Sequence, residues 1–269
     1  MTMPPLPPTG SPADAAIDAA VQAAAEKAAE KDKEKAATTT SRSTGRTGDT
    51  ATCDETDEDT LRLTRDRLRA GLSGPLTEAG RWGAVSLAPG RISFHELHIK
   101  RDLPIIHTWM NDPEIARWWD LAGDIRTTAA HLAERIRLTH ATTYVGCLDD
   151  QPVSYWELYR ADLDPLADHY AARPHDVGVH LLIGPAAYRG RGLGSLLLCV
   201  VSDLILRAAP ETQRVIADPD VRNSASIAAF RRAGFRRAAD LALPGKTAAL
   251  MLRDRSPVAG SATRSAASA

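Results

Sequence analysis

The sequence predicts an α/β fold in which helices flank a mixed central sheet. Three observations support this prediction. Strand-like and helix-like segments alternate from about residue 90 onward, a glycine-rich loop joins one strand to a long helix, and a second strand–helix unit follows. In an alternating order of this kind, helices cover the faces of the sheet. We expect this folded domain to occupy residues 90–254.

The sequence outside this domain has a composition that predicts little packing. Residues 1–55 contain no aromatic side chain and pass from proline-rich to alanine-, glutamate- and lysine-rich and then to serine- and threonine-rich sequence. Such a segment cannot bury enough apolar surface to offset its ordering entropy, so we expect a disordered tail. Residues 56–89 are expected to form an accessory helix and a linker, and residues 255–269 a second disordered tail.

Charge and cysteine content argue against several classes of partner. The 269 residues include 33 Lys and Arg and 34 Asp and Glu, a formal net charge of −1. Without a global positive field, we expect no nucleic-acid partner and no binding to anionic membranes. No basic segment precedes a long apolar run, so neither a signal peptide nor a membrane span is expected. Three widely spaced cysteines fit a reducing cytoplasm and a protein without zinc.

The expected elements of the domain follow from the period of their apolar residues. They are, in chain order, a strand at Ile92–Leu97, helices at Asp102–Met110 and Thr128–Thr139, strands at Thr142–Leu148, Pro152–Tyr159 and Asp176–Ile183, a helix at Leu193–Arg207, a strand at Arg214–Ala217, a helix at Ser224–Ala233, and strands at Phe235–Leu241 and Thr247–Leu252. Asp149 and Asp150 form the predicted turn of a hairpin, and Thr127 or Thr128 is the expected start of the second helix.

The predicted strand at Asp176–Ile183 has one uniformly apolar face. Val177, Val179, Leu181 and Ile183 alternate with Asp176, Gly178, His180 and Leu182. His180 therefore lies on the opposite face, three residues before the turn that leads to the glycine-rich loop.

The glycine-rich loop Arg189-Gly190-Arg191-Gly192-Leu193-Gly194 joins this strand to the long helix. Glycines let backbone N–H groups approach an anion closely, and the start of the helix adds free donors and a positive dipole end. Arg189 and Arg191 add full charge, so the loop is suited to hold a pyrophosphate. Its spacing matches neither the dinucleotide fingerprint nor the P-loop, because Leu193 and Ser195 flank Gly194.

A second motif occupies residues 218–235 and has the order Asn-x-x-Ser-x-x-x-Phe-x-x-x-Gly-Phe, beginning at Asn223. Asn223 or Ser224 is a good helix N-cap, and a glycine ends the helix before the next strand. The two motifs together resemble the acyl-CoA site of the GNAT N-acyltransferase superfamily, whose pyrophosphate loop reads (Arg/Gln)-x-x-Gly-x-(Gly/Ala). The expected order of elements, β-α-α-β-β-β-α-β-α-β-β, is also similar to that superfamily.

This resemblance implies a GNAT fold with splayed strands and acetyl-CoA or another acyl-CoA as co-substrate, without a metal. The implied cofactor-binding residues are Leu181, Leu182, Arg189, Gly190, Arg191, Gly192, Leu193, Gly194, Ser195, Asn223, Ser226 and Phe230. A backbone N–H near Leu181–Leu182 would polarise the thioester carbonyl. Many members carry a tyrosine in place of Phe230 that protonates the leaving thiolate. In this chain the thiolate must leave unaided or take its proton from another group.

Two residues are candidates for proton transfer. His180 is the only histidine on the predicted cofactor strand, and imidazole can take a proton near neutral pH. The alternative is a structural histidine whose hydrogen bonds are satisfied within the fold. Asp218 ends the neighbouring strand, where it would orient His180, accept the amine proton itself or cap the next helix.

Residues 175–185 resemble the corresponding strand of siderophore-pathway acyltransferases of the aerobactin and mycobactin type, which act on lysine, hydroxylysine or hydroxyornithine. The candidate substrate-binding residues are Trp118, Trp119, Trp156, Glu157 and Tyr159. Acidic residues at 162, 164 and 168 either attract a cationic substrate or form a solvated loop. Arg160 and Arg173 are available for a substrate carboxylate. We expect a small-molecule amine or hydroxylamine as acceptor and a monomer or homodimer.

Two alternatives remain open. The segment Arg101–Trp119 resembles siderophore acyltransferases but also aminoglycoside 6′-N-acetyltransferases, so an antibiotic-modifying enzyme is one alternative. The other is a non-catalytic acyl-CoA-binding sensor or scaffold.

Overall fold

The computed structural model describes residues 19, 22, 84–87 and 90–256. The two expected tails and the accessory helix lie outside this part of the chain, apart from residues 19, 22, 255 and 256.

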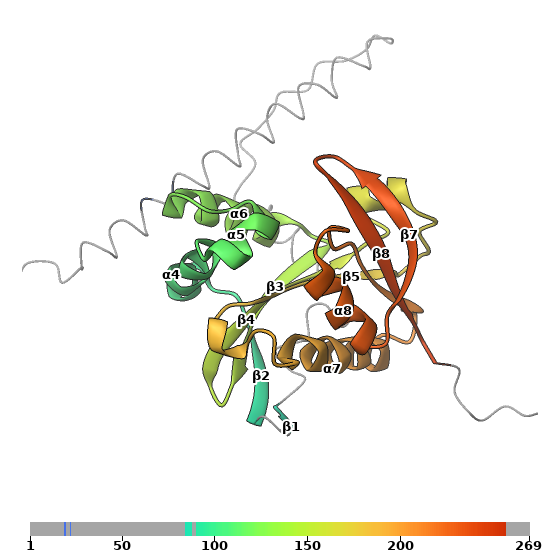
Figure 1. Cartoon of the computed structure of the whole chain (residues 1–269), viewed down its shortest axis with the longest axis horizontal. Helices are drawn as coiled ribbons and strands as arrows, with labels where there is room; N and C mark the ends of the chain where they lie inside the picture. The colour runs from blue at the N-terminus through green and yellow to red at the C-terminus, as the bar shows by residue number, and fades with distance from the viewer. Residues whose placement is uncertain (1–18, 20–21, 23–83, 88–89, 257–269) are drawn as a thin grey trace, which may run out of the picture.

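The described residues form an eight-stranded mixed sheet with helices on both faces (Figure 1), which confirms the predicted α/β class. The strands are β1 (Val85–Leu87), β2 (Gly90–Glu96), β3 (Ala141–Leu148), β4 (Gln151–Arg160), β5 (Val177–Ile183), β6 (Arg214–Ala217), β7 (Arg236–Leu243) and β8 (Lys246–Asp254). Their order across the sheet is β1-β2-β3-β4-β5-β6-β8-β7. The helices are α4 (Ile99–Met110), α5 (Pro113–Trp119), α6 (Ile125–Arg137), α7 (Leu193–Ala208) and α8 (Ser224–Arg232), with short 3-10 turns η2 (Pro165–His169) and η3 (Ala186–Tyr188).

The sheet opens between β5 and β6. These strands are parallel and pair at only two positions, Val177 with Val215 and Gly178 with Ile216. Beyond Gly178, β5 continues to Ile183 without a partner on β6, whereas its other edge pairs with β4 along its whole length. This edge of β5 therefore faces a gap rather than a neighbouring strand, as the expected splayed sheet requires.

Two separate hydrophobic clusters cover the two faces of the sheet. One joins α7 and α8 to β5 and β6 through Val177, Val179, Leu197, Val215 and Phe230, among others. The other joins α4, α5 and α6 to β3, β4 and β5 through Leu103, Ile115, Leu132, Val145 and Leu182, among others. Figure 1 shows α4, α5 and α6 in green, apart from α7 and α8 in orange. The apolar face of β5 packs under α7, and His180 projects from the opposite face, as predicted, toward the side of α5 and α6.

Local structure follows most of the expected boundaries. The hairpin of β3 and β4 turns at Asp149 and Asp150, whose φ angles of 48° and 64° suit a two-residue turn. Helix α6 begins three residues earlier than Thr128, because the Asp124 side chain accepts the Arg126 N–H as its N-cap.

Besides the two 3-10 turns, one short helix and one short strand were not predicted. Helix α5 is entered through Asp112, whose carboxylate accepts the Glu114 N–H, and begins at Pro113. Strand β1 pairs antiparallel with β2, within the segment expected to be a linker.

Candidate active site

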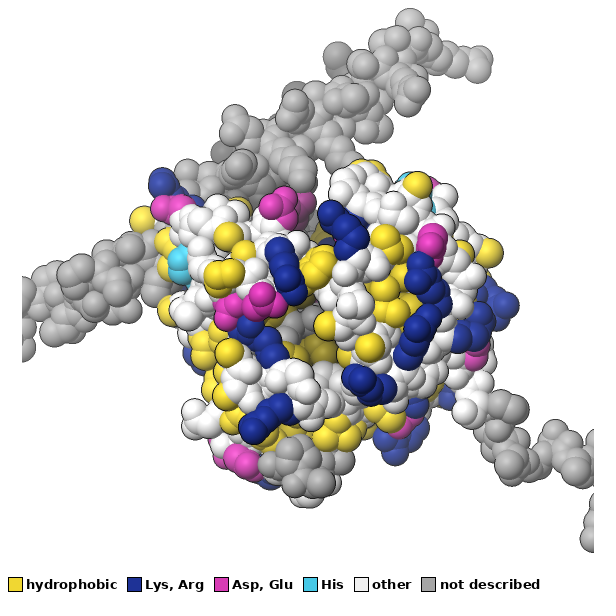
Figure 2. All heavy atoms as spheres, in the orientation of Figure 1, with side chains coloured by type: hydrophobic (Ala, Val, Ile, Leu, Met, Phe, Trp, Pro, Cys, Tyr) yellow, Lys and Arg dark blue, Asp and Glu magenta, His cyan; other side chains and the backbone are white. Residues whose placement is uncertain are grey.

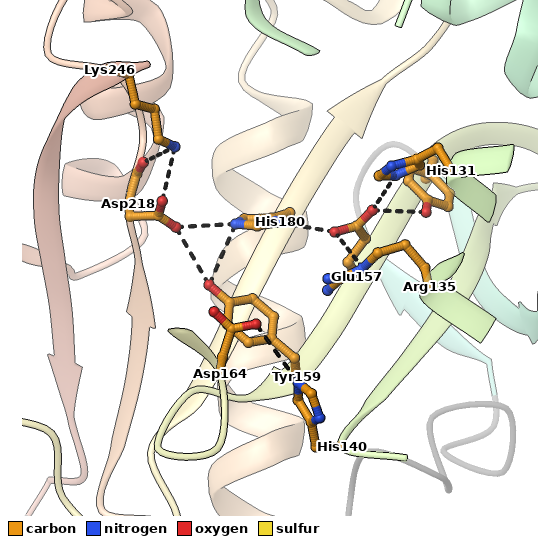
Figure 3. Close-up of polar contacts among 10 residues, drawn as sticks. His131, Arg135, His140, Glu157, Tyr159, Asp164, His180, Asp218 and Lys246 are labelled. Carbon is orange, nitrogen blue, oxygen red and sulfur yellow. Dashed lines mark hydrogen bonds and ion pairs between the residues drawn. The ribbon is translucent and has the colours of Figure 1, made fainter. Parts of the chain in front are cut away.

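His180 lies at the centre of a chain of polar side chains on the face of the sheet that carries α5 and α6 (Figure 3). Its Nδ1 lies 3.0 Å from Oε2 of Glu157, and its Nε2 lies 3.0 Å from Oδ1 of Asp218. The Tyr159 hydroxyl lies 3.4 Å from both Nε2 and Oδ1. We use the name His180 cluster for His180 and the residues joined to it directly or through Glu157 and Asp218. These are His131, Arg135, Tyr155, Glu157, Tyr159, Asp218 and Lys246.

The sheet register explains this meeting of side chains. The antiparallel pairing of β4 and β5 sets Glu157 opposite His180, so their side chains are neighbours on one face. Asp218 directly follows β6, at the place where β5 and β6 have separated. The structure therefore places Asp218 beside His180, where it can orient the ring.

Glu157 is a buried anion whose oxygens are all engaged. Oε1 accepts the Tyr155 hydroxyl at 2.9 Å and faces Nε2 of His131 at 2.7 Å, while Nε of Arg135 lies 3.1 Å from Oε2. Burial alone would raise the pKa of Glu157, but hydrogen bonds from His131 and His180 and the nearby cations hold it well below its ordinary value. Glu157 therefore orients the Nδ1 side of the His180 ring and is not free to bind a substrate.

Asp218 is also buried, and besides His180 it contacts a second cation, Lys246. Lys246 Nζ donates to Oδ2 and to the main-chain oxygen of Asp218, each at 2.8 Å. Burial raises the pKa of Asp218, whereas the hydrogen bond and charge of His180, followed by those of Lys246, lower it to about 2. Asp218 is thus ionised at neutral pH.

The two carboxylates decide the protonation of His180. Burial alone would lower its pKa, but hydrogen bonds and charge interactions with Asp218 and Glu157 outweigh burial and raise it to about 9. At neutral pH the ring is an imidazolium that donates one N–H to each carboxylate. Its side chain is 35% exposed, so part of the ring is accessible to a ligand.

The structure separates the candidate substrate-binding aromatic residues. The Trp119 ring meets the His180 ring edge-on, with centroids 6.3 Å apart, and Tyr159 lies 5.1 Å from it. Trp118 instead packs under the Arg117 guanidinium at 4.9 Å. Trp156 lies on the opposite face of β4, in the core beneath α7, edge-to-face with Phe94. Trp119, Glu157 and Tyr159 are therefore together at His180, whereas Trp118 and Trp156 are not.

The open edge of β5 presents the backbone of Leu181. The Gly184 N–H donates to the Val153 oxygen on β4. Because backbone groups alternate in direction along a strand, those of Leu182 also face β4, while those of Leu181 and Ile183 face the gap. The Arg189 contact with the Ile183 oxygen, at 3.1 Å, agrees with this direction. Of the two residues proposed to polarise a thioester, Leu181 has its N–H on the open side.

The glycine-rich loop leaves the first turn of α7 without a side-chain cap. Gly190 and Gly192 adopt φ angles of 70° and 89°, and a Cβ at either position would meet nothing within 4 Å. Gly192 is the N-cap residue, so no side chain satisfies the N–H groups that follow it. Gly194 faces β5, where a Cβ would lie 3.7 Å from the Ile183 side chain. The outer side of the loop is thus open and suited to an anion.

Arg189 does not offer its charge to this open side. Its guanidinium forms a two-point ion pair with Asp112, at 2.6 and 3.1 Å, and also donates to the Ile183 and Gly184 carbonyls. It fixes the loop to the start of α5. Arg191 is exposed, with one contact at 3.4 Å to the Ala187 oxygen, and is the loop cation available to a ligand. Leu193 is buried in the core and Ser195 is half-buried in the first turn of α7.

The second motif stabilises the start of α8. The Asn223 side chain accepts the Ser226 N–H at 3.0 Å, which confirms Asn223 as the N-cap. Phe230 is buried and packs edge-to-face on Phe235, with centroids 5.0 Å apart. Its ring has no polar group that could protonate a thiolate.

Four members of the His180 cluster were not predicted. His131 and Arg135 come from α6 and Tyr155 from β4, far in sequence from the two motifs, and Lys246 comes from the start of β8, after the second motif. His131 and Arg135 are four residues apart and therefore share one face of a helix, and this spacing was the signal that could have identified them. No sequence pattern marks Lys246.

The described part of the chain lacks two other kinds of feature, a membrane-spanning helix and a cluster of metal ligands. No helix in it is long and apolar enough to cross a membrane. No three His, Cys, Asp or Glu side chains within the same residues are grouped so as to hold a metal ion.

Comparison with known proteins gives a family and several relatives. The Acetyltransferase (GNAT) domain family matches residues 98–243. N(6)-hydroxylysine O-acetyltransferase of Escherichia coli is 33% identical over 147 residues, 55% of this chain and 47% of that protein. Lysine N-acyltransferase MbtK of Mycobacterium sp. (strain MCS) is 34% identical over 123 residues, 46% of this chain and 50% of that protein.

Among solved structures, an uncharacterized protein from Bacillus halodurans matches with a TM-score of 0.61 and 32% identity, covering 64% of this chain and 89% of that one. The chain spans about half the length of the curated relatives it matches.

Proposed function

Since the chain belongs to the GNAT acetyltransferase family, we propose that it transfers an acyl group, preferably acetyl, from acyl-CoA to the side-chain nitrogen of a lysine- or ornithine-type substrate in siderophore biosynthesis. The observation that carries this proposal is the Glu157–His180–Asp218 array at the opening between β5 and β6. The names of the relatives support the substrate class. We place the reaction in the cytoplasm, with no nucleic-acid or membrane partner.

The acyl-CoA site follows from the open backbone groups. The uncapped first turn of α7 and the exposed Arg191 would hold the pyrophosphate, and the Leu181 N–H on the free edge of β5 would donate to the thioester carbonyl. The co-substrate supplies its acyl group as a thioester, which is activated toward an amine. Arg189 contributes by fixing the loop rather than by direct contact.

His180 and Asp218 act together in proton transfer. Glu157 and Asp218 hold the two ring nitrogens at equal distances, and we assign the exchange of a proton with the acceptor to Nε2, because its partner Asp218 lies where β5 and β6 have separated. With a pKa of about 9, about one ring in a hundred is neutral at pH 7, and that fraction is a stronger base than an ordinary histidine. The reaction rate is therefore expected to rise with pH until His180 has lost its proton.

The exposed charges of the cleft favour an uncharged acceptor nitrogen. The accessible polar side chains are those of His180 and Lys246, each 35% exposed, and His131 at 22%. The carboxylates of Glu157 and Asp218 are only 3% and 8% exposed. Figure 2 shows Lys and Arg side chains around the hollow between the α4–α6 layer and α8, and also Asp and Glu side chains on the α4–α6 side. The exposed polar groups next to His180 are not anionic, so they disfavour a polycation but accept a hydroxylamine nitrogen, which is uncharged at neutral pH. This favours an N-hydroxylated amino acid over an aminoglycoside.

The acidic loop after β4 gives little support to a cationic substrate. Asp162 pairs with Arg160 at 2.7 Å, and Asp164 faces His140 at 3.7 Å and caps η2. These carboxylates stabilise their own loop, and Arg160 is correspondingly unavailable to a substrate carboxylate.

Release of free CoA from acetyl-CoA tests this function. We expect turnover with N6-hydroxylysine or N5-hydroxyornithine at least tenfold above that with kanamycin at pH 7, with lysine between them. Faster turnover of kanamycin would favour the antibiotic-modifying alternative. Tight CoA binding without turnover of any of these acceptors would favour a sensor.

A further inference from the structure

Lys246 is joined to the His180 cluster by the turn between β7 and β8. It is the first residue of β8 and follows Gly245, whose φ of 81° allows the tight turn. Its Nζ lies 2.8 Å from Oδ2 of Asp218 and 2.8 Å from the main-chain oxygen of the same residue. The hairpin thereby places an ammonium group on the side of the carboxylate that His180 leaves free (Figure 3).

Charged and titratable groups face the His180–Asp218 pair from several elements. Glu157 and Tyr159 come from β4, His131 and Arg135 from α6, and Lys246 from β8. Asp164 and Asp220 interact by charge over longer distances, Asp164 with Tyr159 and Asp220 with Lys246. Among these described cations, Lys246 and His180 are the two that bind Asp218 itself, one at each carboxylate oxygen.

We propose that Lys246 is a positioning residue that limits how tightly the His180–Asp218 pair holds its proton. Two cations that share one carboxylate each weaken the hold of that carboxylate on the other. With Lys246 in place, His180 releases its proton more readily than it would beside an unshared Asp218. The kinetic consequence rests on the acyl transfer proposed above, whereas the titration of His180 does not.

The second contact of Lys246 fixes the direction of the carboxylate. Because Nζ binds the main-chain oxygen as well as Oδ2, it holds the Asp218 side chain in one orientation. Oδ1 is then directed at Nε2 of His180. Charge and orientation are separable, since glutamine at position 246 could keep a hydrogen bond without the charge.

The test is the NMR titration of the His180 ring in wild type, Lys246→Met and Lys246→Gln, with its signal assigned by loss in His180→Gln. Removing the charge should raise the pKa of His180 by about 0.5–1 pH unit in both variants. Lys246→Arg, which retains the charge, should stay near wild type. Lys100→Met removes the same charge from an exposed position on α4 and should leave the titration unchanged.

An unchanged or lowered pKa of His180 in both neutral variants would overturn the inference. If one variant does not fold, as judged by circular dichroism, the other decides. If the enzyme turns over an acceptor, kcat/KM of Lys246→Met and Lys246→Gln at pH 7 should be about three- to tenfold below that of wild type. The difference should disappear at high pH. If no acceptor reacts but the titration shifts, the proposed function fails and the role of Lys246 stands.

Discussion

The glycine-rich loop and the His180 cluster lie beside the same strand, β5, but are built in different ways. The loop is one continuous segment that offers backbone N–H groups, with two glycines in left-handed conformation and an uncapped helix start. The His180 cluster gathers side chains from α6, β4, β5, β8 and the end of β6. Short-range geometry can therefore build an anion site, whereas a tuned proton-transfer site requires the tertiary fold.

This difference predicts that substitutions in the His180 cluster lower kcat, whereas substitutions in the glycine-rich loop weaken CoA binding. Replacing His180 with Gln should produce the largest effect, since it removes the group proposed to take the proton while keeping a polar side chain. We expect kcat to fall by about 10²–10⁴-fold. The dissociation constant of CoA, measured by calorimetry, should change by less than about threefold. Loss of CoA binding together with kcat would mean that the two regions are not independent.

A substitution in the loop should show the opposite pattern. Gly192→Val places a branched side chain at a φ of 89°, which disturbs the start of α7. The KM for acetyl-CoA should rise about tenfold or more, with kcat at saturation reduced only a few-fold. Gly123→Val is the matched control, because Gly123 has a φ of 125° and equally open space but lies between α5 and α6. An equal rise in KM in both variants would attribute the effect to general strain.

The neighbouring tryptophans of α5 offer a smaller and sharper comparison. Trp119→Ala removes the ring that contacts His180 and should lower kcat/KM for the acceptor about five- to tenfold. Trp118→Ala removes a ring that packs under Arg117 and should change kcat/KM for the acceptor by less than about twofold. Steady-state kinetics with varied acceptor distinguishes them. Equal losses would show that α5 acts as a unit and not through one ring.

Most of the fold could be predicted because its signals are local. The alternation of β5 placed His180 on the face opposite Val177 and Val179, and the turn at Asp149-Asp150 marked a hairpin. Helix α5 was missed because seven residues give too short a periodic signal, although Asp112-Pro113 is a recognisable start.

The candidate site was predictable only in part. The two motifs predicted the cofactor segments and the alternation of β5 made His180 a candidate, but the partners of Arg189 and Asp218 are set by contacts between distant segments. Trp156 is instructive, since its position between Tyr155 and Glu157 already assigns it to the opposite face of a strand. Applying that alternation to every candidate would have removed it from the substrate wall.

The pH dependence of kcat/KM with an N-hydroxylated acceptor tests most directly whether the His180–Asp218 pair takes the proton. This acceptor is already uncharged at neutral pH, so the slope between pH 7 and 9 belongs to the enzyme. Because the hydrogen bonds and charges of the carboxylates raise the pKa of His180 to about 9, the neutral base form increases as pH rises. We predict that kcat/KM rises up to about pH 9 and then levels, and that Asp218→Asn moves this plateau to lower pH. A wild-type profile that is flat, or that falls between pH 7 and 9, would contradict the account.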